Sequence, residues 1–267
     1  MIRLLVLDLD GTMLRPNGSV GEEDAREVRR VHDSGTVVAV ATGRVRQSFQ
    51  YVVDAFGFEP HVICANGSYV SAPGGPPVVD KTLPPDVVAP LLREIVKRGV
   101  YAHIFTGDGE VVTPAEKYPG TTSSKIIHVQ DVAAYVEAQN SVTRKITCKG
   151  PADQIPGIRD WLRSNWGDTL SVSQTGPNSA EAMPAGCSKH KGLMLVMEML
   201  GVDAGDAMAI GDAENDAELL TAVGYPVAMG NATPDVKKIA RYITASNGEG
   251  GVAKAIAHFR EAGLLGD

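Results

Sequence analysis

The sequence predicts an α/β protein with a doubly wound parallel sheet and a second, α+β domain inserted into it. At both ends of the chain, apolar segments of strand length alternate with amphipathic segments of helix length, which is the pattern of a parallel sheet covered by helices. Between them the strands become short and mixed, which is typical of an antiparallel sheet. The predicted Rossmann-like core comprises residues 1–82 and 184–267, and the predicted insert comprises residues 83–183.

The N-terminal part of the core begins with a continuous apolar run over residues 2–7, typical of a central strand that is buried on both faces. Residues 22–34 have helical spacing of apolar side chains and stop at Gly35. Three further elements are expected: a strand over 36–41, a helix over 47–56 and a strand over 61–65.

The insert is expected to follow a Pro- and Gly-rich hairpin turn at residues 72–77. Its expected strands are 101–106, 143–148, 169–173 and 180–183, and its expected helices lie near 86–98, 131–138 and 153–165. The alternating pattern then resumes. The elements expected there are helices over 189–200, 216–222, 234–240 and 251–261 and strands over 207–210, 226–229 and 242–244.

Composition narrows the class of protein. The formal net charge of -7 argues against general binding to nucleic acid or to anionic membranes, because both need basic patches. The three cysteines, Cys64, Cys148 and Cys187, are odd in number and form no CxxC pair, so a thiolate zinc site is not expected. No apolar stretch reaches the ~20 residues of a membrane span, and no leader pattern precedes residue 8. A cytoplasmic protein is expected.

Five polar clusters fall where expected elements of the core begin or end. In an open parallel sheet, ligands bind outside the carboxyl ends of the strands, so the clusters are expected to meet at one edge. Each cluster alone is also typical of an ordinary turn or helix start, whereas their combination favours a site. The clusters are Asp8-Leu9-Asp10-Gly11-Thr12, Thr42-Gly43-Arg44, Asn66-Gly67, Ser188-Lys189 and Gly211-Asp212-Ala213-Glu214-Asn215-Asp216.

The carboxylates of Asp8, Asp10, Asp212 and Asp216 would place four negative charges at this edge. At ~4 Å and an effective dielectric near 20, each like-charged pair costs about 4 kcal/mol, so the group requires a cation. Oxygen ligands of this kind suit Mg²⁺, which often bridges to a substrate phosphate. Lys189 is a second source of positive charge.

The motifs resemble the haloacid dehalogenase (HAD) superfamily of phosphatases in order and residue type. The chain carries DLDGT in the first strand, a threonine at the end of the second, a lysine and then GDAEND. ATGR, ANG and the run GDAENDAELL…VAMGNA resemble the Cof-type branch, whose large α/β cap is inserted between the second and third motifs. The resemblance covers about residues 1–80 and 184–267, and the insert matches only in position and size.

The resemblance implies a covalent phosphoryl transfer. Asp8 would attack phosphorus and form an aspartyl-phosphate, while Asp10 would protonate the leaving oxygen and then activate water. Burial beside other carboxylates is expected to raise the pKa of Asp10 for this role. The implied ligands of Mg²⁺ are Asp8, the backbone carbonyl of Asp10, Asp212 and, directly or through water, Asp216. The implied phosphate- and substrate-binding residues are Thr42, Gly43, Arg44, Lys189 and Asn215.

Three assignments have alternatives. Asn215 would orient either the phosphate or Lys189. The family's lysine is typically followed by glycine, which matches Lys191-Gly192, but the spacing to the end of the helix favours Lys189. Arg44 suits a structural salt bridge as well as it suits substrate contact.

The insert would act as a lid that excludes water and supplies specificity groups. Its candidates, each of which also suits an ordinary surface residue, are His103, Lys125, His128, Arg144 and Lys145.

The leading hypothesis is therefore an Mg²⁺-dependent phosphomonoester hydrolase of a small metabolite, with a sugar phosphate as substrate. The alternative substrates are phosphoglycolate or another small phospho-acid, and a mutase would use the same covalent step. A regulatory module that binds phosphate or metal without turnover is the alternative from another class, and the presence of both Asp8 and Asp10 counts against it. A nucleotide-binding dehydrogenase is disfavoured because no GxGxxG follows the first strand.

Overall fold

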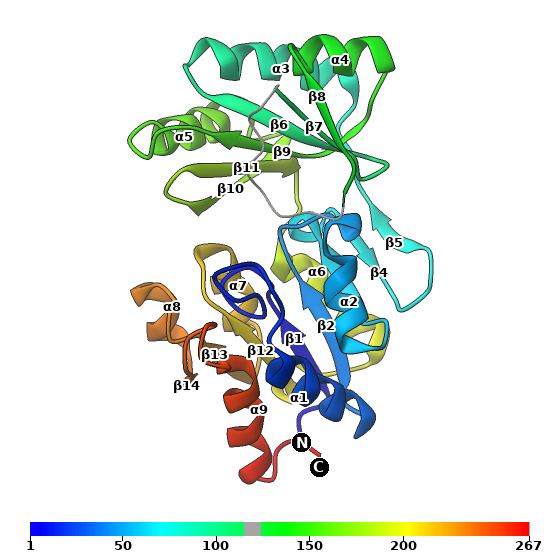
Figure 1. Ribbon diagram of the computed structural model, residues 1–267, viewed down its shortest axis with the longest axis vertical. Coiled ribbons are helices and arrows are strands. Elements are labelled where there is room, and N and C mark those ends of the chain that lie inside the picture. The colour runs from blue at the N-terminus through cyan, green and yellow to red at the C-terminus, as the bar shows by residue number, and fades with distance from the viewer. Residues whose placement is uncertain (115–123, 267) are drawn as a thin grey trace. The chain divides into compact units, whose positions relative to one another are not determined.

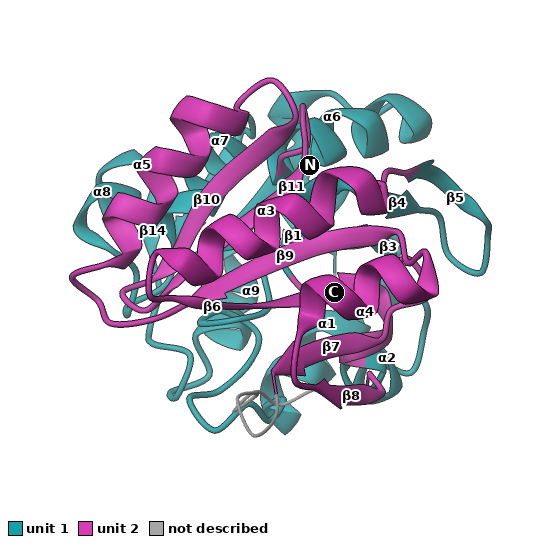
Figure 2. Cartoon of the chain, turned by 90° about the horizontal axis from the view of Figure 1, so that it is seen from above, with its two compact units in different colours: residues 1–43, 50–79, 189–267 teal, residues 44–49, 80–188 magenta. Residues whose placement is uncertain are grey.

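The structure is a computed structural model that describes residues 1–114 and 124–266. The chain forms two compact units, coloured teal and magenta in Figure 2. Unit 1 contains Met1–Gly43, Gln50–Val79 and Lys189–Asp267, and unit 2 contains Arg44–Phe49 and Asp80–Ser188. No helix within the described residues is both long and apolar enough to cross a membrane.

Unit 1 is built on an eight-stranded sheet with the order β14-β13-β12-β1-β2-β3-β4-β5. From β14 to β3 the neighbouring strands are parallel, and β4 pairs antiparallel with β3. The predicted doubly wound parallel sheet is confirmed. The strands are β1 (Leu4–Leu7), β2 (Val37–Ala41), β3 (His61–Cys64), β4 (Tyr69–Ser71), β5 (Pro77–Asp80), β12 (Ala207–Gly211), β13 (Tyr225–Ala228) and β14 (Tyr242–Ile243).

Strand β1 is the point where the order of the sheet reverses, because β2 and β3 extend from one side and β12 to β14 from the other (Figure 1). The register places Leu7 beside Val40 of β2 and Ile210 of β12. The residues that follow these three positions therefore leave the sheet at one edge. Ligands bind at such a reversal, outside the carboxyl ends of the strands.

Helices cover both faces of this sheet. Helix α1 (Glu22–Asp33) packs against α2 (Gln50–Phe56) and α9 (Gly251–Glu261), and α6 (Lys189–Leu200) packs against α7 (Ala217–Thr221). Figure 2 shows α6 on the opposite side of the sheet from α1 and α2. Unit 1 also contains the α-helix α8 (Pro234–Ile239).

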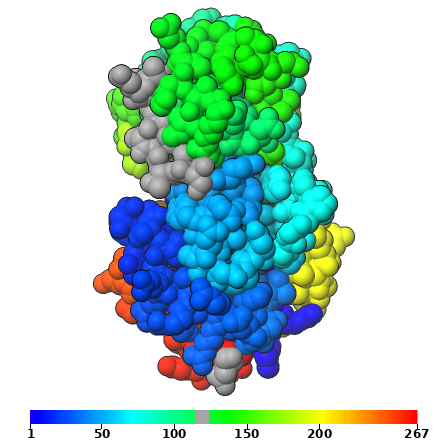
Figure 3. Space-filling view, turned by 45° about the vertical axis from the view of Figure 1, so that its right-hand side comes forward, coloured from blue at the N-terminus to red at the C-terminus, as the bar shows by residue number. Residues whose placement is uncertain are grey.

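The two ends of the chain meet in unit 1. The backbone N–H of Ile2 donates to the carbonyl of Leu264 at 2.8 Å. The blue N-terminal and red C-terminal segments accordingly lie side by side in Figures 1 and 3. The core of unit 1 thus unites sequence segments that the insert separates.

Unit 2 contains a six-stranded sheet with the order β10-β11-β9-β6-β7-β8. The four predicted strands appear as the neighbours β10, β11, β9 and β6, all antiparallel. The prediction missed β7 and β8, which pair in parallel, because four-residue runs carry too weak a pattern. The strands are β6 (Tyr101–Thr106), β7 (Val111–Pro114), β8 (Ile126–Val129), β9 (Thr143–Lys149), β10 (Leu170–Gly176) and β11 (Ser179–Pro184).

Three helices of unit 2, α3 (Pro85–Lys97), α4 (Val132–Gln139) and α5 (Ile155–Trp166), lie together on one side of its sheet (Figure 2). Alternate residues of the strands, such as Ile104 and Ile146, join the apolar core under these helices. The residues between them, such as His103 and Lys145, point to the opposite face because successive side chains of a strand alternate.

Candidate active site

A buried lysine joins two of the predicted carboxylates. Asp8 directly follows β1, and Lys189 is the first residue of α6. The Lys189 Nζ donates to Asp8 Oδ1 and to Asp216 Oδ1, both at 2.6 Å. The three residues are 4%, 2% and 0% exposed, so these charges interact with little screening by water.

Asp216 also shapes the loop that follows β12. Its second oxygen, Oδ2, accepts the backbone N–H groups of Asp212 and Ala213, each at 3.1 Å. A Cβ on Gly211 would lie 2.7 Å from the Cβ of Asp216, so the tight approach of this loop requires glycine. The motif GDAEND therefore has a structural reason for its glycine and its last aspartate.

Asp212 packs against the loop that follows β1. The hydroxyl of Thr12 donates to Asp212 Oδ1 at 3.2 Å. Gly11 has φ +84°, and a Cβ on it would lie 2.2 Å from Asp212 Oδ2. The glycine of DLDGT thus supplies both a left-handed turn and room for the carboxylate of Asp212, which is distant in the sequence.

Asp8, Asp212 and Asp216 form what we call the acid cluster, because each offers a carboxylate oxygen within 4.8 Å of the others. Burial raises the pKa of Asp8 well above its usual value, against the lowering effect of Lys189. Burial and then the charge of Asp216 raise the pKa of Asp212 to about 6. Although burial opposes it, the Asp216 and Asp8 carboxylates raise the pKa of Lys189, which remains an ammonium.

One ammonium lies among three carboxylates. Burial is the main cause of the raised pKa values of Asp8 and Asp212, and the neighbouring carboxylates add to it. Closely spaced carboxylate oxygens are the donor set that Mg²⁺ prefers. The residues of the acid cluster therefore fit a divalent cation.

The other predicted residues of the core occupy different surroundings. Thr42 is fully buried after β2, and its backbone N–H donates to the carbonyl of Ile63 at 2.8 Å. Gly43 is half-buried. Asp10 is exposed, so the expectation that burial surrounds it is wrong, although its charge contributes to the raised pKa of Asp212. The reason is that Asp10 lies past the end of β1, in the turn rather than at the strand terminus.

Asn66 contacts two other residues predicted for the site, which the dipeptide Asn66-Gly67 alone did not indicate. Its backbone N–H donates to the carbonyl of Thr42 at 3.0 Å, and its Oδ1 accepts the amide of Asn215 at 3.2 Å. Asn66 is 3% exposed, with φ +50° after Ala65 with φ +45°. Consecutive non-glycine residues in this region are strained, and such strain is concentrated at functional sites.

Asn231 is a residue to which the sequence analysis assigned no role. Its side-chain amide donates to the carbonyl of Gly11 at 2.8 Å, and its Oδ1 accepts the backbone N–H of Asn247 at 2.9 Å. The VAMGNA run that contains it was the only signal. Asn231 thus supports the turn that positions Asp212.

The comparisons with known proteins show the family of the chain. The family model of haloacid dehalogenase-like hydrolases matches residues 5–256. The chain belongs to this family. A protein of Escherichia coli (strain K12) named HMP-PP phosphatase is 30% identical over 244 residues, which is 89% of this chain and 87% of that protein.

Solved structures of HAD-like hydrolases share the fold. One from Bacteroides thetaiotaomicron is 26% identical, with a TM-score of 0.84, and covers 97% of this chain and 100% of that one. One from B. subtilis is 24% identical, with a TM-score of 0.85 over 96% of this chain and 99% of that one, and shows the fold alone. The family and the named phosphatases among its relatives make this chain a HAD-type phosphatase.

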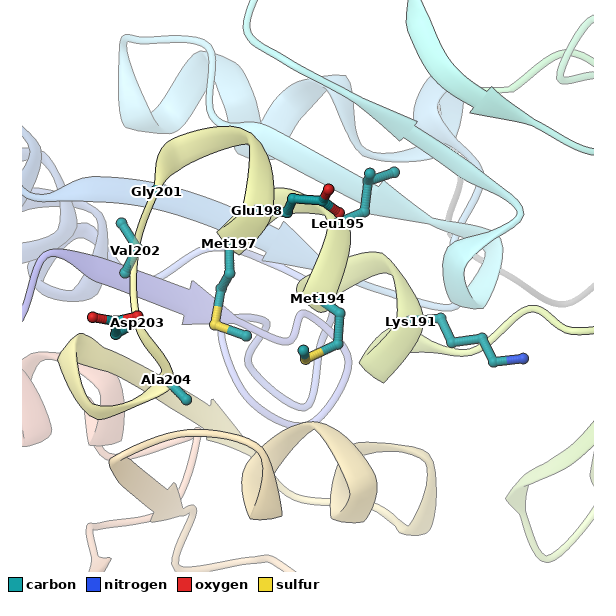
Figure 4. A pocket seen from close by; sticks show the side chains of 9 residues that line it. All are labelled: Lys191, Met194, Leu195, Met197, Glu198, Gly201, Val202, Asp203 and Ala204. Atoms are coloured by element: carbon teal, nitrogen blue, oxygen red, sulfur yellow. The ribbon is translucent and has the colours of Figure 1, made fainter.

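Of the two lysines considered in this HAD-like hydrolase, only Lys189 lies at the acid cluster. Lys191 is exposed on the same helix and lines a separate pocket with Met194 and Leu195 (Figure 4). Two residues of separation on a helix place side chains on different faces, which explains the difference.

The candidates in unit 2 of this HAD-like hydrolase are mostly ion-paired. Arg144 pairs with Asp80, and Lys145 pairs with Glu181 at 2.6 Å. Lys125, exposed, pairs with Glu110 at 2.8 Å. His128 is exposed, whereas burial and then Lys145 lower the pKa of the buried His103 to about 3. Arg44 belongs to unit 2 and is half-buried.

Proposed function

We propose that this HAD-type phosphatase is an Mg²⁺-dependent phosphomonoester hydrolase that forms an aspartyl-phosphate on Asp8. The observation that carries the proposal is the Lys189 ammonium held between Asp8 and Asp216, 2.6 Å from each, inside the acid cluster. Lys189 lowers the pKa of Asp8 against the effect of burial, and the ionised carboxylate is the form that attacks phosphorus.

Asp8 is the proposed nucleophile. Lys189 already donates a hydrogen bond to Asp8 Oδ1, so we assign Oδ2 as the attacking oxygen. In the first step Oδ2 bonds to phosphorus while the bond from phosphorus to the ester oxygen breaks. Asp10 gives its proton to that oxygen, and the alcohol leaves.

Water completes the reaction. Asp10, now a carboxylate, takes a proton from water as the water oxygen attacks phosphorus. The bond from phosphorus to Asp8 breaks, inorganic phosphate leaves, and both aspartates regain their starting states.

Asp8, Asp212 and the backbone carbonyl of Asp10 are the proposed direct ligands of Mg²⁺. Asp216 accepts three hydrogen bonds, from Lys189 and from two backbone N–H groups, whereas Asp8 accepts one from Lys189, so we assign Asp216 to contact through water and Asp8 to direct contact. When bound, Mg²⁺ offsets the negative charge of the carboxylates and of the phosphoryl oxygens.

Further residues of the core are proposed to hold the phosphoryl group. The proposed contacts are the hydroxyl of Thr42 and the ammonium of Lys189, with the Gly43 backbone and the Arg44 guanidinium as substrate contacts. The side-chain amide of Asn215 donates a hydrogen bond to Asn66, and we propose that this hydrogen bond orients Asn215 toward the phosphate.

Unit 2 is proposed to be the cap that sets substrate choice. The face of its sheet away from the helices carries hydrogen-bonding groups, among them His103, Thr147 and Glu181. Because hydroxyl groups of a sugar need such partners, we propose a sugar phosphate as the substrate. The name of the Escherichia coli relative, HMP-PP phosphatase, favours HMP-PP as the second candidate.

The test is the release of inorganic phosphate from a panel that contains sugar phosphates, HMP-PP and phosphoglycolate, with Mg²⁺ and with a chelator instead. We expect Mg²⁺-dependent release, lost in Asp8→Asn. Asp168→Asn, a change at an exposed aspartate of unit 2, is the matched control and retains activity. Turnover by Asp8→Asn at the wild-type rate would refute the proposal.

A further inference from the structure

One face of α6 is exposed and apolar at its centre. Met194 is 47% exposed and Met199 is 42% exposed, although large apolar side chains are usually buried. Beside Met194, a pocket of 610 Å³ opens between the helix and the segment that follows it (Figure 4). The residues that line it are Lys191, Met194, Leu195, Met197, Glu198, Gly201, Val202, Asp203 and Ala204.

The opposite face of α6 is fully used within unit 1. Lys189 reaches the acid cluster, and Leu193 and Val196 are completely buried. Gly192 packs so closely on β3 that a Cβ would lie 2.3 Å from a side-chain carbon of Ile63. The exposed face therefore lies on the side of α6 that points away from the sheet of unit 1.

Lys191, Met194, Leu195 and Glu198 form what we call the α6 stripe. Their spacing of i, i+3, i+4 and i+7 places them on one face of the helix. The stripe has a basic residue at its N-terminal end, two apolar residues in its middle and an acidic residue at its C-terminal end. Asp203 adds a second acidic group at the rim of the pocket near that end.

This order of residues is complementary to itself when the helix is turned by a two-fold rotation. In an antiparallel pair of α6 helices, Lys191 faces Glu198 of the partner subunit. The same register places Met194 against Leu195 of the partner subunit. A parallel pair would instead bring lysine to lysine and glutamate to glutamate, which costs free energy.

We propose that the α6 stripe is the interface of a symmetric dimer whose partner is a second copy of this chain. Two-fold symmetric dimers are the commonest oligomers, and their interfaces use the same patch on both subunits. Met194 and Leu195 of each subunit supply an apolar centre that the flexible methionine makes adaptable, and the two equivalent ion pairs at its ends fix the orientation. The proposal is independent of the catalytic proposal.

The test is sedimentation velocity of the full-length chain over a range of concentrations. We expect a reversible dimer whose dissociation constant rises with salt. Lys191→Glu and Glu198→Lys each place two like-charged pairs in the interface and are expected to raise that constant at least tenfold. The double variant Lys191→Glu/Glu198→Lys exchanges the charges and is expected to restore the dimer.

Met194→Asp is a second disrupting variant, which places a charge in the apolar centre and is expected to yield monomer. Circular dichroism melting reports whether each variant is folded. A wild-type chain that is monomeric throughout the range overturns the proposal. So does a dimer that is insensitive to Met194→Asp and to both single charge reversals, or a double variant that remains as monomeric as the single ones.

Discussion

Replacing Lys189 with methionine removes one positive charge from the acid cluster and keeps most of the side-chain volume. Lys189 donates to Asp8 and Asp216 at 2.6 Å. At that separation and an effective dielectric near 20, each attraction is about 6 kcal/mol before the cost of removing the ions from water. After that cost, loss of one partner of a buried pair lowers stability by about 3–5 kcal/mol.

We therefore expect Lys189→Met to lower the free energy of unfolding by about 3–5 kcal/mol at pH 7.5 without metal. The loss is expected to be smaller at pH 5, because protonation of Asp8 and Asp212 relieves the repulsion. Loss of the charge beside the nucleophile is expected to lower kcat by about 10²–10³.

Urea unfolding followed by circular dichroism measures the stability, and phosphate release measures kcat. Lys254→Met changes an exposed lysine on α9 and is the matched control, with an expected effect within about 0.5 kcal/mol. If Lys189→Met were as stable and as active as the control, the charge balance that we assign to the acid cluster would be wrong.

Three further predictions follow from the same contacts. Burial raises the pKa of Asp212 from 3.8 to about 6, so the folded, metal-free protein binds more protons than the unfolded chain in that window. The contribution of Asp212 to stability therefore falls as pH rises from 4 to 6. Mg²⁺ should raise Tm more at pH 7.5 than at pH 5, and calorimetry that finds equal increases contradicts this. Gly11→Ala should weaken Mg²⁺ binding at least tenfold in titration calorimetry, because the added Cβ would lie 2.2 Å from Asp212 Oδ2. An unchanged affinity would count against Asp212 as a ligand of Mg²⁺. Asn66→Gly should have a Tm no lower than that of the wild type, because glycine adopts φ +50° without strain. Its kcat should fall about tenfold, because the hydrogen bond to Asn215 is lost. An unchanged kcat would show that this hydrogen bond does not serve the reaction. Asn66→Asp keeps an acceptor for Asn215 and should retain more activity.

The sheet of unit 1 was predictable because its strands are short apolar runs that end in polar residues. Asp8 at the end of such a run already indicated a charge that needs a partner, and the structure supplies Lys189. The two are 181 residues apart, and only the rule that parallel strands share one edge brings them together. A strong local pattern and a topological rule were sufficient here.

Other features depend on tertiary structure that the local pattern does not encode. The left-handed conformation of Asn66 follows from its bonds to Thr42 and Asn215, not from the sequence around it. The exposure of Asp10 depends on where the turn after β1 begins. The four-residue strands β7 and β8 are specified by pairing with each other and with β6 rather than by periodicity.

The most direct test of the account is to trap the covalent intermediate during turnover. Borohydride reduces an acyl phosphate of aspartate to homoserine, and mass spectrometry of peptides locates the modified residue. We predict homoserine at position 8 when the protein is quenched with a substrate and Mg²⁺, and unmodified Asp8 when substrate is left out. Rapid turnover with the modification at another carboxylate, or with none, would contradict the assignment of Asp8 as the nucleophile.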